Sequence, residues 1–407
     1  MHDHARNGSR SWLNRTVLGI GLASLFSDWS HEIATTILPQ FLASLGAAAV
    51  WLGLIEGVSD GLSSIAKMAS GYYTDRLRQR KPIAVVGYLM TTLATAAIGM
   101  ATGAWHVLLA RATAWLGRGL RTPVRKALLA GSVDRSAYGR AFGFERMMDT
   151  LGAVVGPGTA FLLFNVWHFH YPALFAATLI PGLVAVALMS FLVREKTREP
   201  VPYISFMGSL RALPAGFSQF VVAVGVFGLG DFAHTLLILL ATQKLAPILG
   251  VAAAASWGIA LYVLHNVLYA AFSFIGGWMA DHVDKRRLLA TGYLLAAAMA
   301  AIVIFTPPSI VMFIFVFGLG GIFVALEETA EDSLCADFVH DNQHGTAFGV
   351  VATVNGIGDF ASSLIVGTLW TVFGTTTAFS YSAVLFVVGA ILILRLPSVK
   401  KGSIKNG

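Results

Sequence analysis

The stretch Gly71-Tyr-Tyr-Thr-Asp75-Arg76 recurs as Gly277-Trp-Met-Ala-Asp281-His282, 206 residues further along the chain. A basic pair follows each copy, Arg80-Lys81 in the first and Arg286-Arg287 in the second. Both copies therefore combine a small residue, an acidic residue and a short basic cluster at nearly the same spacing. This pattern predicts two equivalent turns in two equivalent parts of the chain.

Further matches at the same offset support a duplication of the chain. Gly139-Arg-Ala-Phe142-Gly143 aligns with Gly345-Thr-Ala-Phe348-Gly349, and Gly152 aligns with Gly358. Several matches at one spacing are not expected by chance. We therefore predict two similar halves joined by a linker at 194–212, where charged residues and proline concentrate. Parallel halves of this kind hold a substrate site at the midplane between them.

The composition indicates a membrane protein. The 407 residues are 56% hydrophobic and only 12% charged, with a mean hydropathy of +0.71, whereas a soluble domain needs more charged surface. The single cysteine, Cys335, excludes a disulfide framework or a cysteine-based metal cage. The formal net charge of +7 lies in short clusters between apolar runs, which favours membrane lipid over nucleic acid as a partner.

Apolar runs of about 20 residues can cross a bilayer as helices, and the chain contains twelve. Their approximate cores are 16–42, 50–73, 83–103, 105–128, 140–165, 171–193, 214–241, 253–279, 288–306, 309–334, 345–372 and 376–395. We therefore predict an all-α membrane protein with twelve transmembrane helices in two pseudo-symmetric six-helix halves.

Basic residues alternate between the loops and predict the orientation of the chain. The loops near 43–49, 165–170, 305–308 and 373–375 have no Lys or Arg, and Lys244 is the main exception on that side. The positive-inside rule then places both termini in the cytoplasm, in a multi-pass protein expected in a bacterial inner membrane. The expected regions are an N-terminal tail (1–15), a first half (16–193), a linker (194–212), a second half (213–396) and a C-terminal tail (397–407).

The repeated loop resembles the signature of the major facilitator superfamily, Gly-x-x-x-Asp-Arg-x-Gly-Arg-Arg/Lys. Arg78 replaces the second glycine in the first copy, and the second copy departs at His282 and Asp284. The resemblance extends along essentially the whole chain and implies that family's fold. It also implies a conformational latch in which the loop aspartate contacts the neighbouring half. The matching latch residues are Gly71, Asp75, Arg76, Arg80, Asp281 and Arg286.

Two more segments resemble patterns of this family. Arg111, followed by Gly117 and Gly119, resembles a fourth-helix signature that is often linked to proton transfer. The stretch Gly152-Ala-Val-Val-Gly156-Pro157 resembles a fifth-helix motif of antiporting exporters, although Ala160 and Phe161 replace its two further glycines. The resemblance is thus to a bacterial twelve-helix, exporter-like branch. Small residues also let helices approach closely, which explains these glycines without any family.

Charged residues inside membrane spans are costly and usually face a cavity or each other. The candidates for proton coupling or cavity lining are Asp28, Glu32, Asp60, Arg111, Arg118, Asp231 and His234. Alternating access can move a carboxylate between an apolar cavity and a neighbouring arginine, which changes its proton affinity. The alternative is that these groups form static ion pairs between helices.

The repeat also predicts a gate. At the 206-residue offset, Arg121 corresponds to Glu327 and Arg125 to Glu331. Opposite charges at equivalent positions would form ion pairs between the halves that close the cytoplasmic side. The alternative is that the arginines bind lipid phosphate or the Asp75 loop while the glutamates face cytoplasmic water.

These observations predict a secondary transporter and not an enzyme. No nucleotide-binding loop or catalytic motif is present in the sequence, so we expect a proton gradient to drive transport without any cofactor or metal. We predict a proton-coupled antiporter that exports a small organic solute (drug-like, metabolite or siderophore-like) and works as a monomer. The alternatives are proton-coupled uptake of an anionic metabolite, transport of a transition metal or its chelate, and a non-transporting membrane sensor.

Overall fold

The computed structural model describes residues 11–47, 49–195 and 206–397, and every element in these ranges is helical. The first half contains α1 (Arg15–Ser44), α2 (Ala49–Thr74), α3 (Lys81–Ala97), η1 (Ile98–Met100), α4 (Ala104–Ala130), η2 (Arg135–Ala137), α5 (Tyr138–Phe161), η3 (Leu162–Val166), α6 (Tyr171–Ala177) and α7 (Leu179–Phe191). The predicted linker contains α8 (Phe206–Arg211). The second half contains α9 (Ala215–Gly228), α10 (His234–Leu249), α11 (Val251–His282), α12 (Lys285–Phe305), α13 (Ile310–Phe338), α14 (His344–Phe373) and α15 (Thr375–Arg395). Parts of the predicted tails and linker (1–10, 398–407 and 196–205) lie outside the described residues.

The twelve-span fold is confirmed, and each span corresponds to one helix or to two consecutive helical segments. Eight spans are long and apolar enough to cross a membrane by length and composition alone. The other four are α1, α2, α4 and the pair α9–α10. The first three of these carry charged residues along their length, and the fourth is interrupted. The spans with the weakest apolar signal are therefore the ones that hold most of the candidate functional groups.

The interruption between α9 and α10 corrects the prediction of one continuous span at 214–241. Glycine disfavours a helix, and Gly228 and Gly230 flank the point where α9 ends. Backbone groups freed inside a membrane need partners, and here α14 supplies them. The Ser362 hydroxyl donates to the Asp231 carbonyl at 2.5 Å, and the Ala233 N–H donates to the Ser363 hydroxyl at 3.1 Å. The break places Asp231 in a helix-free turn.

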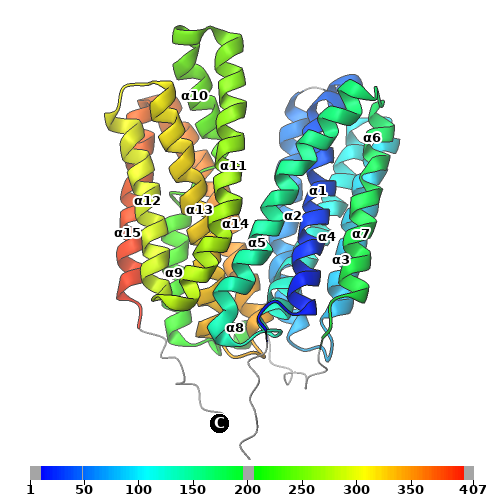
Figure 1. The fold of residues 1–407 in the computed structure, drawn as a ribbon, viewed down its shortest axis with the longest axis vertical. Coiled ribbons are helices and arrows are strands. Elements are labelled where there is room, and N and C mark those ends of the chain that lie inside the picture. Colours follow the sequence, from blue (N-terminus) through cyan, green and yellow to red (C-terminus); the bar gives the residue numbers. More distant parts are fainter. Residues whose placement is uncertain (1–10, 48, 196–205, 398–407) are drawn as a thin grey trace, which may run out of the picture.

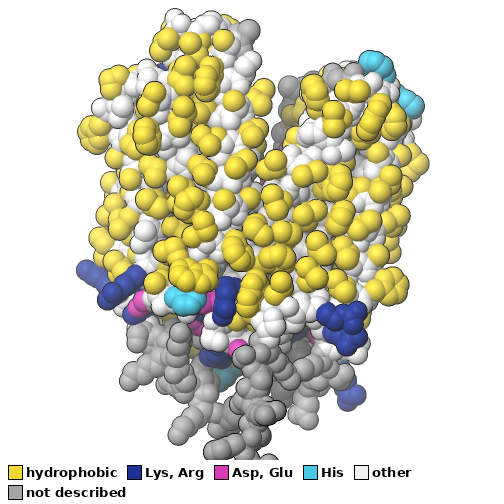
Figure 2. Space-filling view, viewed as in Figure 1, with side chains coloured by type: hydrophobic (Ala, Val, Ile, Leu, Met, Phe, Trp, Pro, Cys, Tyr) yellow, Lys and Arg dark blue, Asp and Glu magenta, His cyan; other side chains and the backbone are white. Residues whose placement is uncertain are grey.

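The helices form two lobes, with α1–α7 in one and α9–α15 in the other (Figure 1). The lobes contact each other through α5 with α11 and through α2 with α14. They meet at the end that carries the turns 75–80 and 283–284, which we call the closed end. At the opposite, open end the lobes separate, and the space-filling view shows a notch between them (Figure 2).

The two seams between the lobes are copies of each other. A side chain at Gly71 would collide with the Gly345 carbonyl, and one at Gly277 would collide with the Gly139 carbonyl. Residues that are equivalent in the repeat also meet directly: the Phe142 and Phe348 rings lie 5.6 Å apart, centroid to centroid. Glycines at these crossings let the helix backbones touch. The repeated glycines of the sequence therefore form the contact surface between the halves.

Charged side chains are distributed unequally between the two ends. Hydrophobic side chains cover both lobes on the face shown in Figure 2, and Lys and Arg side chains gather toward the closed end. The turns at the open end, such as 45–47, 101–103, 167–170 and 306–309, contain no Lys or Arg. The basic asymmetry expected from the sequence thus corresponds to the two ends of the structure.

Candidate functional site

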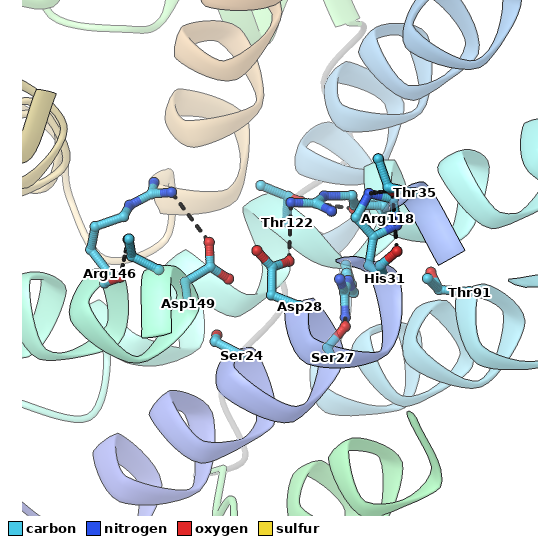
Figure 3. Close-up of polar contacts among 12 residues, drawn as sticks. Ser24, Ser27, Asp28, His31, Thr35, Thr91, Arg118, Thr122, Arg146 and Asp149 are labelled. Carbon is cyan, nitrogen blue, oxygen red and sulfur yellow. Dashed lines mark hydrogen bonds and ion pairs between the residues drawn. The ribbon is translucent and has the colours of Figure 1, made fainter. Parts of the chain in front are cut away.

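The centre of the first lobe is an ion pair between α1 and α4. The Asp28 carboxylate lies 3.2 Å from the Arg118 guanidinium, with 8% of the Asp28 side chain and 27% of the Arg118 side chain exposed. Figure 3 shows Asp28 between Arg118 on one side and Asp149 of α5 on the other. The buried Asp28 carboxylate therefore has a partly accessible arginine as its partner. Asp28 also interacts with a second carboxylate, that of Asp149.

Two glycines of α5 determine how closely that helix approaches this ion pair. A side chain at Gly152 would collide with the Leu25 carbonyl and contact Asp28, and one at Gly156 would collide with Glu32. The glycines of the fifth-helix motif therefore pack directly against the α1 turns that carry both predicted coupling carboxylates. Pro157 follows within the same helix.

Replacing Gly152 by valine should abolish transport, because the added side chain forces α5 away from the α1 backbone at Asp28. Gly158 has no atom within 4 Å of an added Cβ, so Gly158→Val is the matched control in the same helix. We expect at least a tenfold loss of flux in proteoliposomes for the first variant and less than a twofold loss for the second. Equal flux in both variants would contradict the packing role of Gly152.

Arg111 is more deeply buried than Arg118 in the same lobe, and it contacts both α1 and α2. Its Nη2 lies 3.2 Å from the Glu56 carboxylate and 3.3 Å from the Thr35 hydroxyl. The Trp115 ring lies 4.8 Å from the Arg111 guanidinium carbon and 4.9 Å from that of Arg118. The predicted cavity arginines are thus linked by an aromatic ring that the sequence analysis did not single out.

The predicted gate pairs are not formed in this structure. Arg121 donates to the Ser27 hydroxyl and stacks on the Tyr88 ring, 4.0 Å from its centroid. Arg125 lies 2.9 Å from Glu145 and 3.3 Å from Asp149, both on α5 of the same lobe. These carboxylates hold the arginine away from the opposite half.

On the other side, the predicted gate glutamates stay within the second lobe. Glu331 accepts a hydrogen bond of 2.7 Å from the Asn355 amide, and Glu327 lies one helical turn earlier on the same helix, α13. The predicted pairs do not form because Arg125 pairs with carboxylates of α5, and Arg121 contacts a hydroxyl and an aromatic ring, all within the first lobe.

Near the closed end, two ion pairs join α4 and α5 of the first lobe to α13 of the second, in addition to the Arg140–Asp281 pair at 2.6 Å. The Lys126 ammonium lies 2.5 Å from Asp332, and the Arg146 guanidinium lies 2.8 Å from Glu328. Glu328 also accepts a hydrogen bond from the Tyr269 hydroxyl of α11. Lys126 and Asp332 are 206 residues apart, so opposite charges at equivalent positions do meet, one residue beyond the predicted positions. The repeat offset was the signal that could have identified this pair.

Asp75 caps the first turn of a helix in the opposite lobe. Its carboxylate accepts hydrogen bonds from the Gly345 N–H at 3.0 Å and from the Thr346 N–H and hydroxyl at 2.7 Å each. Helix N-termini favour negative charge. Arg80 also lies 2.7 Å from Asp75 and donates to the Asp341 carbonyl at 3.2 Å. This is the contact between halves that a latch requires, and the latch function itself stays a prediction.

Asp281 makes the equivalent contact in the other direction. It accepts from the Gly139 N–H at 2.7 Å and the Arg140 N–H at 3.1 Å, at the start of α5. Arg286, the equivalent of Arg80, instead pairs with Asp284 at 2.6 Å. Hydrogen bonds from Arg286 hold the pKa of Asp284 below its ordinary value. The two latches differ because Asp284 stands where the first copy has Arg78.

The remaining predicted latch residue, Arg76, contacts the short helix within the predicted linker. It donates to the Tyr72 carbonyl at 2.5 Å and to the Ser209 hydroxyl of α8 at 2.6 Å. Arg76 therefore ties the first lobe to the linker.

The second lobe holds the other predicted cavity residues around the helix break. Asp231 lies in the break, and the His234 ring at the start of α10 lies 4.5 Å from that of His265, a partner that the sequence analysis missed. Asp60 of α2 is exposed, as is Asp359 of α14, and both interact with Lys67. Within the described residues, no group of three or more His, Cys, Asp or Glu side chains could hold a metal ion.

The sequence of this chain is similar to those of known transporters. The family model described as Major Facilitator Superfamily matches residues 20–243 and 216–407. An uncharacterized MFS-type transporter of Methanocaldococcus jannaschii is 29% identical over 386 residues, which cover 94% of this chain and 95% of the relative. The multidrug resistance protein MdtH of Yersinia pestis is 25% identical over 317 residues, which cover 76% of this chain and 75% of that protein.

Solved structures share the fold. The crystal structure of the human organic anion transporter MFSD10 has a TM-score of 0.76 at 14% identity and covers 93% of this chain and 99% of that one. That of the transporter FucP in the outward conformation has a TM-score of 0.73 at 16% identity and covers 94% and 99%. At these identities the likeness concerns the fold alone.

Proposed function

The chain belongs to the major facilitator superfamily of transporters, and we propose that it is a proton-coupled antiporter that exports a small organic solute. The family and its fold are those of transporters and not of enzymes. The observation that carries the proposal is the Asp28–Arg118 ion pair, against which Gly152 of the exporter-like motif packs at Asp28. The similarity to multidrug resistance proteins also favours export.

Asp28 is suited to couple protons to the movement of the lobes. When ionised, it attracts Arg118 across 3.2 Å. Protonation removes that charge, so Arg118 and the α1–α4 contact lose their main electrostatic partner. Because Arg118 is the more exposed member of the pair, it is the group that a substrate approaching from the open end reaches. Substrate and proton would then compete for the same pair, as antiport requires.

The distribution of basic residues supports an orientation with the closed end in the cytoplasm. Positively charged loops remain on the cytoplasmic side of membranes, and the basic turns of this chain lie at the closed end. We therefore propose that both termini are cytoplasmic and that this conformation is open to the outside. We also propose that the protein acts as a monomer, surrounded by lipid and without a cofactor.

The test is proton movement in proteoliposomes of defined orientation, on addition of lipophilic cations, organic anions and metal chelates. We expect at least one organic solute to drive a proton flux opposite to its own movement. Asp28→Asn should reduce that proton flux at least tenfold, whereas the exposed turn variant Asp134→Asn should stay within twofold of wild type. Proton flux in the same direction as the solute would overturn antiport, and full coupling in Asp28→Asn would exclude Asp28 as the coupling site.

One observation supports uptake of an anionic metabolite by symport as a second candidate. Arg111, Arg118 and Arg121 all lie on α4, and Arg121 contacts a hydroxyl and an aromatic ring rather than a carboxylate. The same assay separates the candidates, because symport moves protons and solute together.

A further inference from the structure

A cluster of hydrogen-bond donors in the first lobe has no role in the network described so far. The Arg111 side chain is 2% exposed, yet its Nε and Nη1 have no acceptor among the described residues. The indole Nε1 of Trp115 also has no partner there. Buried polar groups are normally hydrogen-bonded, so a set of this kind calls for an acceptor.

These groups lie together. The His31 and Trp115 rings are 4.5 Å apart, centroid to centroid, and the Arg111 guanidinium carbon lies 4.8 Å from the Trp115 ring. The Thr35 hydroxyl contacts both His31, at 3.3 Å, and Arg111, at 3.3 Å. The cluster therefore combines a fixed positive charge, an indole donor and a hydroxyl within one helical turn of α1 and of α4.

Glu56 is the one described carboxylate paired with Arg111, and it is far more accessible than its partner. Its side chain is 37% exposed, and it contacts Nη2 of Arg111 at 3.2 Å. A carboxylate that replaced it would have Nη1 as well as Nη2 available, and bidentate guanidinium–carboxylate contacts are stronger than single ones. Glu56 thus occupies the position where an incoming anion would bind.

We propose that Arg111, with Trp115, forms a subsite for a carboxylate of the transported solute, and that Glu56 occupies it until the solute arrives. The inference rests on the proposed function, because it assigns a chemical class to the organic solute. Glu56 acts as a competitor for the site: the solute carboxylate displaces it from Arg111. Arg111 then supplies a contact for the solute in addition to Arg118, which pairs with the coupling carboxylate.

The test uses benzoate as a probe and its neutral amide, benzamide, as the control of equal shape. Purified full-length protein is titrated with each probe, and the apparent Kd is taken from the concentration dependence of the melting temperature. We expect benzoate to protect the wild type and benzamide to protect it at least fivefold less well. Chloride at equal sodium concentration should protect less than benzoate.

Variants of Glu56 and Trp115 test the proposal by the direction in which the apparent Kd for benzoate changes. Glu56→Gln removes the competitor and should lower the apparent Kd for benzoate at least fivefold, without changing that for benzamide. Trp115→Phe keeps the ring but removes the donor, and should raise the Kd for benzoate at least threefold. Asp134→Asn serves as the control, with less than a twofold change. Arg111→Lys should lose most of the benzoate binding. If Arg111→Lys fails to fold, the Glu56→Gln and Trp115→Phe variants still test the proposal.

A static ion pair predicts a different result. In that case Glu56→Gln would destabilise the protein and leave the Kd for benzoate within twofold, which would overturn the proposal. Equal protection by chloride and benzoate would overturn the assignment to a carboxylate, and no protection by benzoate in any variant would mean that only water satisfies these donors. Failure of antiport in the Asp28 assay would leave the benzoate result standing, so the two proposals can fail separately.

Discussion

Reversing one charge of the Lys126–Asp332 pair should abolish transport. The Lys126 side chain is 12% exposed and that of Asp332 is 4% exposed, so Lys126→Asp places two carboxylates together in a buried interface. Removing one partner of a buried ion pair costs about 3–5 kcal/mol. Each 1.4 kcal/mol changes an equilibrium constant tenfold. We therefore expect the population of the conformation in which the lobes meet at the closed end to fall about 100-fold or more.

The measurement is the distance between spin labels on the two lobes at the closed end. Gln79, in the turn before α3, and Arg287, in the first turn of α12, are both exposed. Cys335 is the single native cysteine, so both labels can be introduced as cysteines in a Cys335→Ala background. Lys126→Asp should lengthen the distance, and the double variant Lys126→Asp/Asp332→Lys should restore it together with at least a third of the flux. An unchanged distance in the single variant would show that the pair does not hold the lobes.

Removing the carboxylate of Asp75 should have a similarly large effect. Three hydrogen bonds to the start of α14 and the contact with Arg80 depend on it. Asp75→Ala leaves buried N–H groups of α14 without an acceptor and removes the carboxylate that pairs with Arg80, and each of these losses costs about 1–3 kcal/mol. We expect at least a tenfold loss of flux and a longer distance between the same two labels.

The two latches provide an internal comparison. Asp281→Ala should act in the same direction as Asp75→Ala, because Asp281 caps α5 in the equivalent way. Asp284→Asn is the matched control, since Asp284 pairs with Arg286 inside the second lobe and contacts no residue of the first in the pairs described. A loss of flux in Asp284→Asn equal to that in Asp75→Ala would indicate a general effect of charge at the closed end instead of a latch.

Apolar length and the 206-residue repeat were sufficient to predict the twelve spans and the two halves. The same information could not predict the break around Asp231, because its backbone is satisfied by Ser362 and Ser363, more than 120 residues away. Glycines within apolar runs are ambiguous until the facing helix is known. Those at 228 and 230 end a helix, whereas Gly152 lets two helices touch.

The candidate charges were predicted better than their partners. Asp28 and Arg118 do form a pair, but Arg125 is paired with Glu145 and Asp149. A helical repeat of charges shows which residues share a face, yet the side of the helix that meets another lobe depends on packing. The partners of Arg125 are acidic residues of α5 that lie within a predicted span, and the sequence alone did not show that they face Arg125.

The duplicated seams have a consequence for how the two halves recognise each other. The first half alone carries both surfaces of a seam, the Gly71–Asp75 turn and the Gly139 helix start, so it is self-complementary there, as the subunits of a symmetric dimer are. Two copies of that half would, however, bring Lys126 against Lys126. Like charges at a contact disfavour the wrong partner. Because the second half has Asp332 where the first half has Lys126, the first half associates preferentially with the second half of the same chain and not with another first half.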